Sequence, residues 1–284
     1  MDKYPSLVEY RRAIASPKTA FVDDSLAKGE VVRDANGMPQ MSSGGFACLA
    51  SIVVDAENTW VVRMFTKPQT NLGVRYKALA DQLPRNCLLE AYFLESGIRV
   101  GDYEKSFPLV IIKFVEGPTL RSFLVDACRN EDKKAISSLR DSFVAMKTEL
   151  KSCQVVHGDL SPDNIIVQKG RSLEFKLVDY DNCWHPSCGP LDSNVGVTAL
   201  QASGKSSIID AFFDDFSFAV YTGVLNLLTI EPKWGIDDDL YEQQFLISLA
   251  DLDDPESSPI LSRMKSQSLK SYVEIMDLYR SNEH

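Results

Sequence analysis

The sequence predicts an α+β fold in two parts, a small β-rich part over residues 1–115 and a helical part over residues 116–284. Runs of β-branched and aromatic residues, separated by turn residues, recur before residue 116 and predict strands there. Beyond it, apolar residues recur at helical spacing over 132–153 and fill 210–229 almost completely. The composition is that of a globular chain, with 44% hydrophobic and 25% charged residues among 284.

The first part contains two strand pairs and one helix. Residues 1–40 are weakly patterned, and the turn-rich stretch 36–45 predicts a loop before the first strand. A helix is expected where Leu72, Tyr76, Leu79 and Leu83 repeat at helical spacing, with Pro84 ending it. The strands are expected at residues 46–54, 59–65 (with 55–58 as the turn between them), 88–100 and 107–115.

The second part opens on an amphipathic helix over residues 132–153. Two short strands are expected at 164–168 and 174–180. Residues 210–229 predict a helix buried on nearly all sides, and amphipathic segments continue to the C-terminus.

Charge and cysteine usage narrow the class of protein. The net charge is −10 and no basic stripe is visible, which argues against nucleic acid as a partner. No apolar run reaches the roughly 18 residues that span a membrane, and the charged N-terminus lacks the apolar core of a signal peptide. The six cysteines are spread along the chain, as expected for reduced thiols in a cytoplasmic protein.

The segment HGDLSPDN, residues 157–164, concentrates polar chemistry beside an Ile/Val run. Asp159 precedes Asn164 by five residues, and Asp179 follows in KLVDYD. Phosphoryl transfer needs a carboxylate that accepts the proton of the attacking hydroxyl and oxygen ligands for Mg²⁺. We therefore predict Asp159 as the catalytic base, Asn164 and Asp179 as metal ligands, and His157 as a structural residue that orients the loop.

HGDLSPDN and DYD resemble the HRDLxxxN and DFG signatures of protein kinases. The resemblance implies a two-lobed protein-kinase-like fold, a β-rich N-lobe and a helical C-lobe that together form one domain and bind ATP and Mg²⁺ in the cleft. SSGGFACL resembles a reduced Gly-rich loop, LVIIKFVEGPTL the fifth strand and hinge, and DDFSFA the opening of helix F. The residues implied are Gly44 and Gly45 at the phosphates, Arg63 on the α/β-phosphates, the backbones of Lys113 and Val115 at adenine, and Asp214 as an anchor of the catalytic loop.

More narrowly, the chain resembles a group of bacterial eukaryotic-like protein kinases with an HGDL…LVDYD core and an arginine in the third strand. The resemblance spans roughly residues 5–270 and includes EYRRAIASPKTAFVDD, GMPQMSSGGFACL and VVRMFTK. Members of this group often occur with a von Willebrand A-type protein and a metal-dependent protein phosphatase. The resemblance thus implies Ser/Thr protein phosphorylation in bacterial signalling, with those two proteins as partners.

Departures from the kinase pattern leave two alternatives open. Ser161 stands where Ser/Thr kinases carry lysine, which is compatible with a small-molecule phosphotransferase similar to aminoglycoside or choline kinases. Arg63 replaces the usual lysine, and neither Asp81, Glu90 nor Glu95 is a secure equivalent of the helix C glutamate. These changes, with the thin Gly-rich loop, are compatible with a nucleotide-binding pseudokinase scaffold. Gly158 also replaces the arginine that clamps a phosphorylated activation loop.

Overall fold

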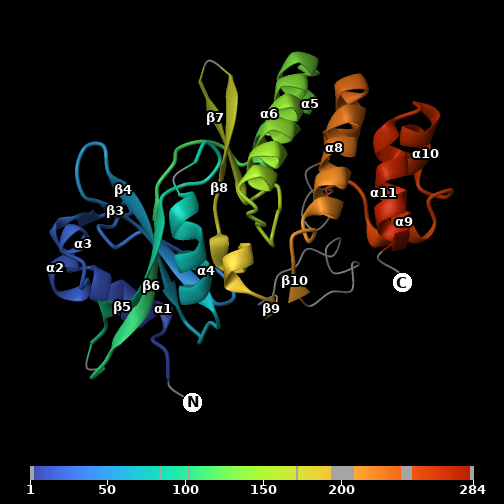
Figure 1. Cartoon of the computed structure of the whole chain (residues 1–284). Helices are drawn as coiled ribbons and strands as arrows, with labels where there is room; N and C mark the ends of the chain where they lie inside the picture. The colour runs from blue at the N-terminus through green and yellow to red at the C-terminus, as the bar shows by residue number, and fades with distance from the viewer. Residues whose placement is uncertain are drawn as a thin grey trace. The chain divides into compact units, whose positions relative to one another are not determined.

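The computed structural model describes residues 3–83, 85–101, 103–170, 172–192, 208–237 and 245–281. It has a mixed α+β architecture in which the main sheet is antiparallel (Figure 1). The chain forms two compact units. The first contains residues 1–84 and 89–115, and the second contains residues 85–88 and 116–284.

The first unit is built on one sheet, whose strands lie in the order β1-β3-β4-β6-β5 with β2 paired to β3. Every pairing in this sheet is antiparallel. Its elements are α1 (Leu7–Ile14), α2 (Pro17–Ala20), α3 (Asp24–Lys28), β1 (Glu30–Val31), β2 (Met41–Ser43), β3 (Ala47–Val53), β4 (Thr59–Phe65), α4 (Leu72–Leu79), the 3₁₀ turn η1 (Ala80–Gln82), β5 (Ala91–Arg99) and β6 (Ser106–Lys113).

The N-terminal helices complete the core of this unit. Tyr10 and Ile14 of α1 and Leu26 of α3 are buried with Val62 and Met64 of the sheet. The hydroxyl of Tyr10 donates a hydrogen bond of 2.8 Å to the carbonyl of Phe65, which satisfies a buried polar group. The first forty residues, whose weak patterning predicted no particular element, thus contain three short helices, of which α1 and α3 have side-chain caps.

The strand predictions for the first unit are confirmed, and the helix prediction is too long. β3, β4, β5 and β6 fall within or close to the predicted ranges, and residues 55–58 form the turn in which Asn58 binds Asp55. The expected loop contains a short strand, β2. Helix α4 ends at Leu79 and tightens into η1, so Leu83 lies beyond the helix, and Pro84 lies outside the described residues.

The second unit is mainly helical, and its two longest helices are packed together. Phe143 of α6 contacts Phe218 and Tyr221 of α8, with ring centroids 5.6 Å apart in both pairs. Its elements are α5 (Leu120–Arg129), α6 (Lys133–Ser152), β7 (Ile165–Lys169), β8 (Leu173–Leu177), η2 (Tyr180–Asn182), η3 (Pro186–Cys188), β9 (Leu191–Asp192), β10 (Ile208–Ile209), α8 (Asp215–Ile230), η4 (Pro232–Gly235), α9 (Leu249–Asp253), α10 (Pro259–Ser266) and α11 (Lys270–Ser281).

Four residues from the first half of the sequence, 85–88, belong to the second unit. The amide of Leu177 donates a 2.8 Å hydrogen bond to the carbonyl of Cys87, and Leu88 forms a parallel bridge with Leu177. Cys87 and Leu88 are both buried. Residues 85–88 therefore extend the β7–β8 hairpin instead of continuing into β5, where the sequence predicts a strand from residue 88.

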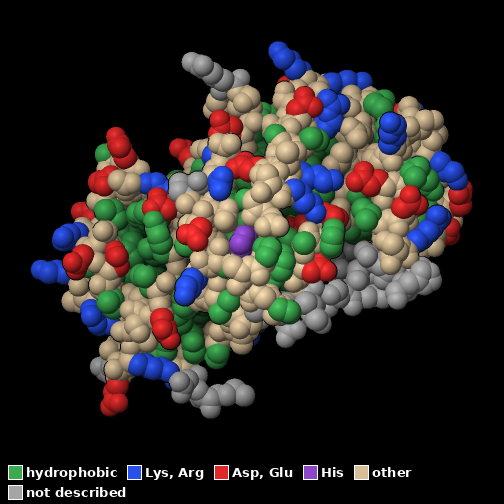
Figure 2. Space-filling model, in the orientation of Figure 1, with side chains coloured by type: hydrophobic (Ala, Val, Ile, Leu, Met, Phe, Trp, Pro, Cys, Tyr) green, Lys and Arg blue, Asp and Glu red, His purple; other side chains and the backbone are tan. Residues whose placement is uncertain are grey.

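Surface charge is mixed, and no helix in the described part of the chain is both long and apolar enough to cross a bilayer. On the face shown in Figure 2, acidic and basic side chains are interspersed.

Candidate active site

The loop that contains His157, Asp159 and Asn164 is held at its start by a short β bridge. Helix α6 ends at Ser152, and Gln154 then adopts a left-handed conformation (φ 56°) that redirects the chain. Val156 and Trp184 exchange two backbone hydrogen bonds of 2.9 Å. This bridge places the start of the loop beside the segment that follows Asp179, one residue before His157.

Asp214, at the start of α8, binds the backbone of this loop. Its carboxylate accepts hydrogen bonds from the amides of His157 (2.6 Å) and Gly158 (3.2 Å). The side chain is buried, and burial raises the pKa of its carboxyl group. Because the two amide donors stabilise the charge, this buried carboxylate fixes the loop to the most buried helix of the unit.

His157 connects the loop to the end of β8. Its Nε2 lies 2.9 Å from the carbonyl oxygen of Val178, which can only accept, so Nε2 is the protonated nitrogen. The ring is fully buried and packs edge-on against Tyr180 at 6.2 Å. A side chain held in this way orients the backbone around it, and it is not exposed to exchange protons with a substrate.

Asp159 and Asn164 are hydrogen-bonded to each other. Nδ2 of Asn164 donates to the backbone carbonyl of Asp159 (2.9 Å) and to its Oδ2 (3.3 Å). Burial, together with the charges of Asp179 and Asp214, raises the pKa of Asp159 to about 6, against the opposing effects of His157 and the Asn164 bond. A carboxylate with this pKa can accept a proton near neutral pH.

Asp179 is brought to this pair through its neighbour Val178. The amide of Val178 donates a 3.0 Å hydrogen bond to the carbonyl of Asn164, while its own carbonyl binds His157. Asp179 follows in a left-handed conformation (φ 67°, ψ 74°), which aspartate tolerates better than most residues. Val178, the residue directly after β8, thus holds His157 and Asn164 beside Asp179.

The donor set fits Mg²⁺. Because Nδ2 of Asn164 faces Asp159, the amide oxygen is the atom left for a ligand, and Asp179 adds a carboxylate. Among the described residues no cluster of three or more histidine, cysteine, aspartate or glutamate side chains could hold a metal ion by itself. Mg²⁺ is commonly held by one or two protein oxygens and completes its shell with phosphates and water.

Gly158 has a steric reason to be glycine. Its φ is 74°, and a Cβ at this position would lie 2.2 Å from the backbone oxygen of Asn182. No other residue fits there without displacing the segment after Asp179. An arginine, which kinases carry at this position, would not fit here because two backbone segments approach closely.

The Gly-rich stretch of the first unit forms the turn between β2 and β3. The amide of Gly44 donates to the carbonyl of Ala47 (2.9 Å), so this donor is used within the turn. A Cβ at Gly44 or Gly45 would meet nothing within 4 Å. The turn is exposed and open, and its glycines are not required by packing within this unit.

The other predicted nucleotide contacts lie on β4 and at the end of β6. Arg63 is half-buried and pairs in register with Leu49 and Val110. The amide of Lys113 donates to the carbonyl of Glu90 (2.8 Å), which leaves its carbonyl as the group for a ligand. The Lys113 ammonium donates a hydrogen bond to Oδ1 of Asn58 and lies over the ring of Trp60. Val115 is the last residue of the first unit.

Neither a protein-family model nor a curated protein matches this chain. The assignment of the site therefore rests on the local geometry and on the motif.

Two residues near these motifs were missed from the sequence. Arg121 of α5 forms an ion pair with Asp163 of the loop, and one of its two hydrogen bonds measures 2.9 Å. The second is Arg75, which is fully buried on α4. Asp81, a candidate for the helix C acidic residue, is exposed in η1. A signal existed for Arg75, because it lies one residue from the apolar stripe of that helix. The pairing of Arg121 with Asp163 joins residues 42 apart and leaves no local pattern.

Proposed function

We propose that this chain is an ATP- and Mg²⁺-dependent phosphotransferase that acts on an alcohol group. The observation that carries the proposal is the hydrogen-bonded pair Asp159–Asn164, tied through Val178 to Asp179. A carboxylate with a pKa of about 6 beside one amide and one carboxylate ligand matches the groups that phosphoryl transfer requires.

In this proposal each residue has one role. Asp159 positions the acceptor hydroxyl and takes its proton. Asn164 and Asp179 hold Mg²⁺, which supplies neutralisation of the phosphate charge when bound. His157 and Asp214 keep the loop backbone in place. Gly44, Gly45, Arg63, Lys113 and Val115 are the nucleotide contacts that the resemblance implies.

The acceptor that we favour is a serine or threonine of a protein. This choice, and a von Willebrand A-type protein and a protein phosphatase as partners, rest on the resemblance alone. Ser161 favours a small alcohol as the second candidate, because its hydroxyl accepts from the Asn164 amide (3.3 Å) and supplies no cation beside the base. A scaffold that only binds nucleotide is the third.

The test is transfer of labelled γ-phosphate from ATP with Mg²⁺, using wild type, Asp159→Asn and Asp179→Asn. Asparagine keeps the size of each side chain and tolerates the left-handed backbone at position 179, so loss of transfer reports the charge rather than misfolding. We expect both variants to lose at least 100-fold in rate, as removal of a catalytic base or metal ligand does.

The outcomes separate the three candidates. Label on wild-type protein or on an added protein substrate supports a protein kinase. ADP release only with a soluble alcohol supports the small-molecule enzyme. Nucleotide binding by thermal shift with no turnover in any of these assays supports the scaffold. Wild-type activity in Asp179→Asn contradicts the assignment of the site.

A further inference from the structure

The outer edge of β5 carries backbone groups that have no hydrogen-bond partner among the described residues. β5 ends the described sheet and pairs only with β6 among its strands. Because the Lys113 amide binds the Glu90 carbonyl, the alternation of an antiparallel ladder directs the backbone groups of Tyr92 toward β6. Those of Ala91 and Phe93 point away from it. No hydrogen bond joins these outward groups to any residue that the structure describes.

The chain itself covers the other end of this edge. Phe21 forms an antiparallel bridge with Ile98, and the amide of Val22 donates to the carbonyl of Gly97 (3.0 Å). An extended segment of this protein is therefore already docked on β5 where the edge is paired. The edge at Ala91–Phe93 offers backbone groups of the same kind, and no residue in the described part of the chain pairs with them.

A groove of about 540 Å³ lies along this open part of the edge, within the first unit. Leu26 of α3 lies on one side of the groove and Tyr76 of α4 on the other. The two sides differ in chemistry. Phe93 faces α4, where its ring is stacked 6.4 Å from that of Tyr76, so this side is apolar apart from the exposed Lys77.

The side that faces α3 is aromatic and acidic. Register places Trp60, Glu90 and Tyr92 on this face of the sheet, and the rings of Trp60 and Tyr92 lie 6.0 Å apart. The hydroxyl of Tyr92 binds Oε1 of Glu90, whereas Oε2 has no hydrogen-bond partner among the described residues. Asp23 adds a second carboxylate, and the one basic residue of the described lining, Lys77, is exposed on α4.

We propose that this groove binds an extended peptide that adds a strand antiparallel to β5 and carries a basic residue between two apolar residues. The two apolar residues lie opposite Ala91 and Phe93, and their side chains contact Tyr76 and Phe93. Successive side chains of a strand point to opposite faces, so the basic residue between them faces Glu90 and the two aromatic rings. Backbone hydrogen bonds supply affinity, and the alternating pockets select the sequence.

Fluorescence anisotropy of a labelled peptide, threonine-leucine-arginine-leucine-threonine, tests the proposal on the full chain. We expect saturable binding that weakens at least tenfold when glutamate replaces the arginine. N-methylation of both leucines removes the donors that face β5 and abolishes binding. N-methylation of the arginine, whose amide points to solvent, leaves binding within about threefold.

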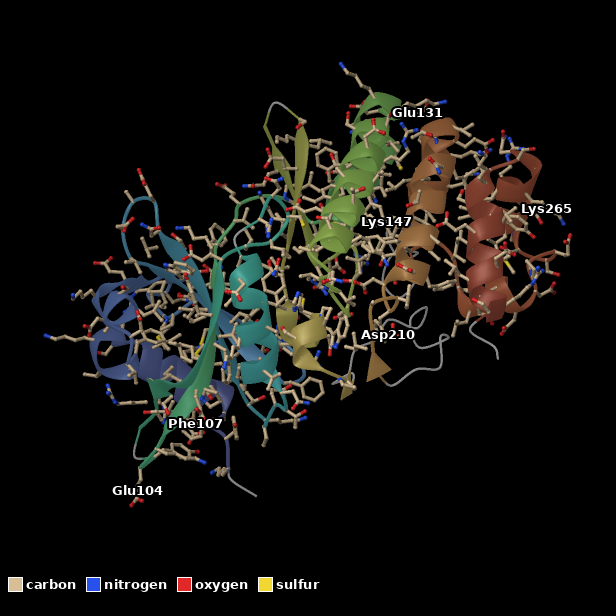
Figure 3. The ribbon with its side chains drawn as sticks, viewed as in Figure 1. Glu104, Phe107, Glu131, Lys147, Asp210 and Lys265 are labelled. Carbon is tan, nitrogen blue, oxygen red and sulfur yellow. The ribbon has the colours of Figure 1, made fainter. Side chains whose placement is uncertain are left out.

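Protein variants complete the test. Glu90→Lys reverses the preference between the arginine and glutamate peptides, and Glu90→Gln, which keeps an acceptor for Tyr92, removes the preference without reversing it. Glu104→Lys is the matched control, because this exposed glutamate lies at the turn between β5 and β6 (Figure 3) and should not change binding. Equal binding of both peptides, or tolerance of methylated leucines, would overturn the proposal.

Discussion

Asp159 carries a charge that the folded chain disfavours. Its pKa rises from 3.8 to about 6 on folding, so its contribution to stability is full below pH 4 and is lost as the pH rises through 6. Asp159→Asn, a mimic of the protonated form, should therefore stabilise the chain by about 3 kcal/mol at pH 8 and by less than about 1 kcal/mol at pH 4. Urea unfolding of both proteins at the two pH values, without nucleotide or metal, measures the difference.

The same substitution should abolish transfer, so stability and activity move in opposite directions. This opposition is typical of a functional residue, because substitution of a residue that serves only the fold would lower both stability and activity. A variant that is less stable than wild type at pH 8 would contradict the pKa given for this carboxyl group.

Gly158 and Gly45 differ in the space around them. Alanine at position 158 meets the backbone of Asn182 in a left-handed conformation and should cost about 2–4 kcal/mol of unfolding free energy. Alanine at position 45 meets nothing within 4 Å and should change stability by about 0.5 kcal/mol or less. Thermal unfolding of the two variants provides the comparison. Equal effects would show that the loop can move away from Asn182 at little cost.

At the scale of elements, α8 fixes the loop at two points. Asp214 binds two loop amides, and the hydroxyl of Tyr221 donates a 2.6 Å hydrogen bond to the carbonyl of Leu160. Asp214→Ala strands two buried donors and should cost about 2–4 kcal/mol, whereas Tyr221→Phe should cost about 1 kcal/mol. Denaturant midpoints give both values. Similar losses in the two variants would mean that the Asp214 contacts add nothing beyond one neutral hydrogen bond.

Long, strongly patterned elements could be predicted from the sequence, and short ones could not. The strands β3 to β6 and helix α6 stand close to their predicted ranges because each has many residues with one period. Helix α1 has only eight residues, although Ser6 and Glu9 form a capping box that was a readable signal. Helix α5 was missed despite an apolar stripe of Leu120, Leu124 and Cys128 behind a Thr119 cap.

In the candidate site, the polar residues could be predicted from the sequence, whereas the contacts that hold them could not. His157, Asp159 and Asn164 are recognisable because their spacing is local. The contacts that hold them are not, since Asp214 lies 57 residues from His157 and Val178 lies 21 residues from it. The sequence indicated Asp214 only through a resemblance. Gly158 must be glycine because the backbone of Asn182 approaches it closely. No spacing pattern in the sequence predicts this approach.

At the scale of the whole molecule, the second unit depends on residues 85–88. A fragment of residues 116–284 lacks the Cys87 carbonyl that accepts from the Leu177 amide. Hydrogen exchange at Leu177 should therefore be on the order of tenfold faster or more in the fragment than in the full chain. Val167 is the internal control, because its amide binds the carbonyl of Pro118, which the fragment retains. Equal protection of Leu177 in both proteins would show that residues 85–88 are dispensable.

Those four residues also limit how the chain can be recombined. The polypeptide passes from one unit to the other at three places, near residues 84, 88 and 115. A chimera joined only at residue 115 would carry one parent's tetrapeptide against the other parent's β8. Its buried Cys87 and Leu88 would then meet a foreign surface. When either unit is exchanged between related genes, residues 85–88 must therefore come from the same parent as the C-terminal half. They then form a four-residue insert within the other parent's N-terminal half.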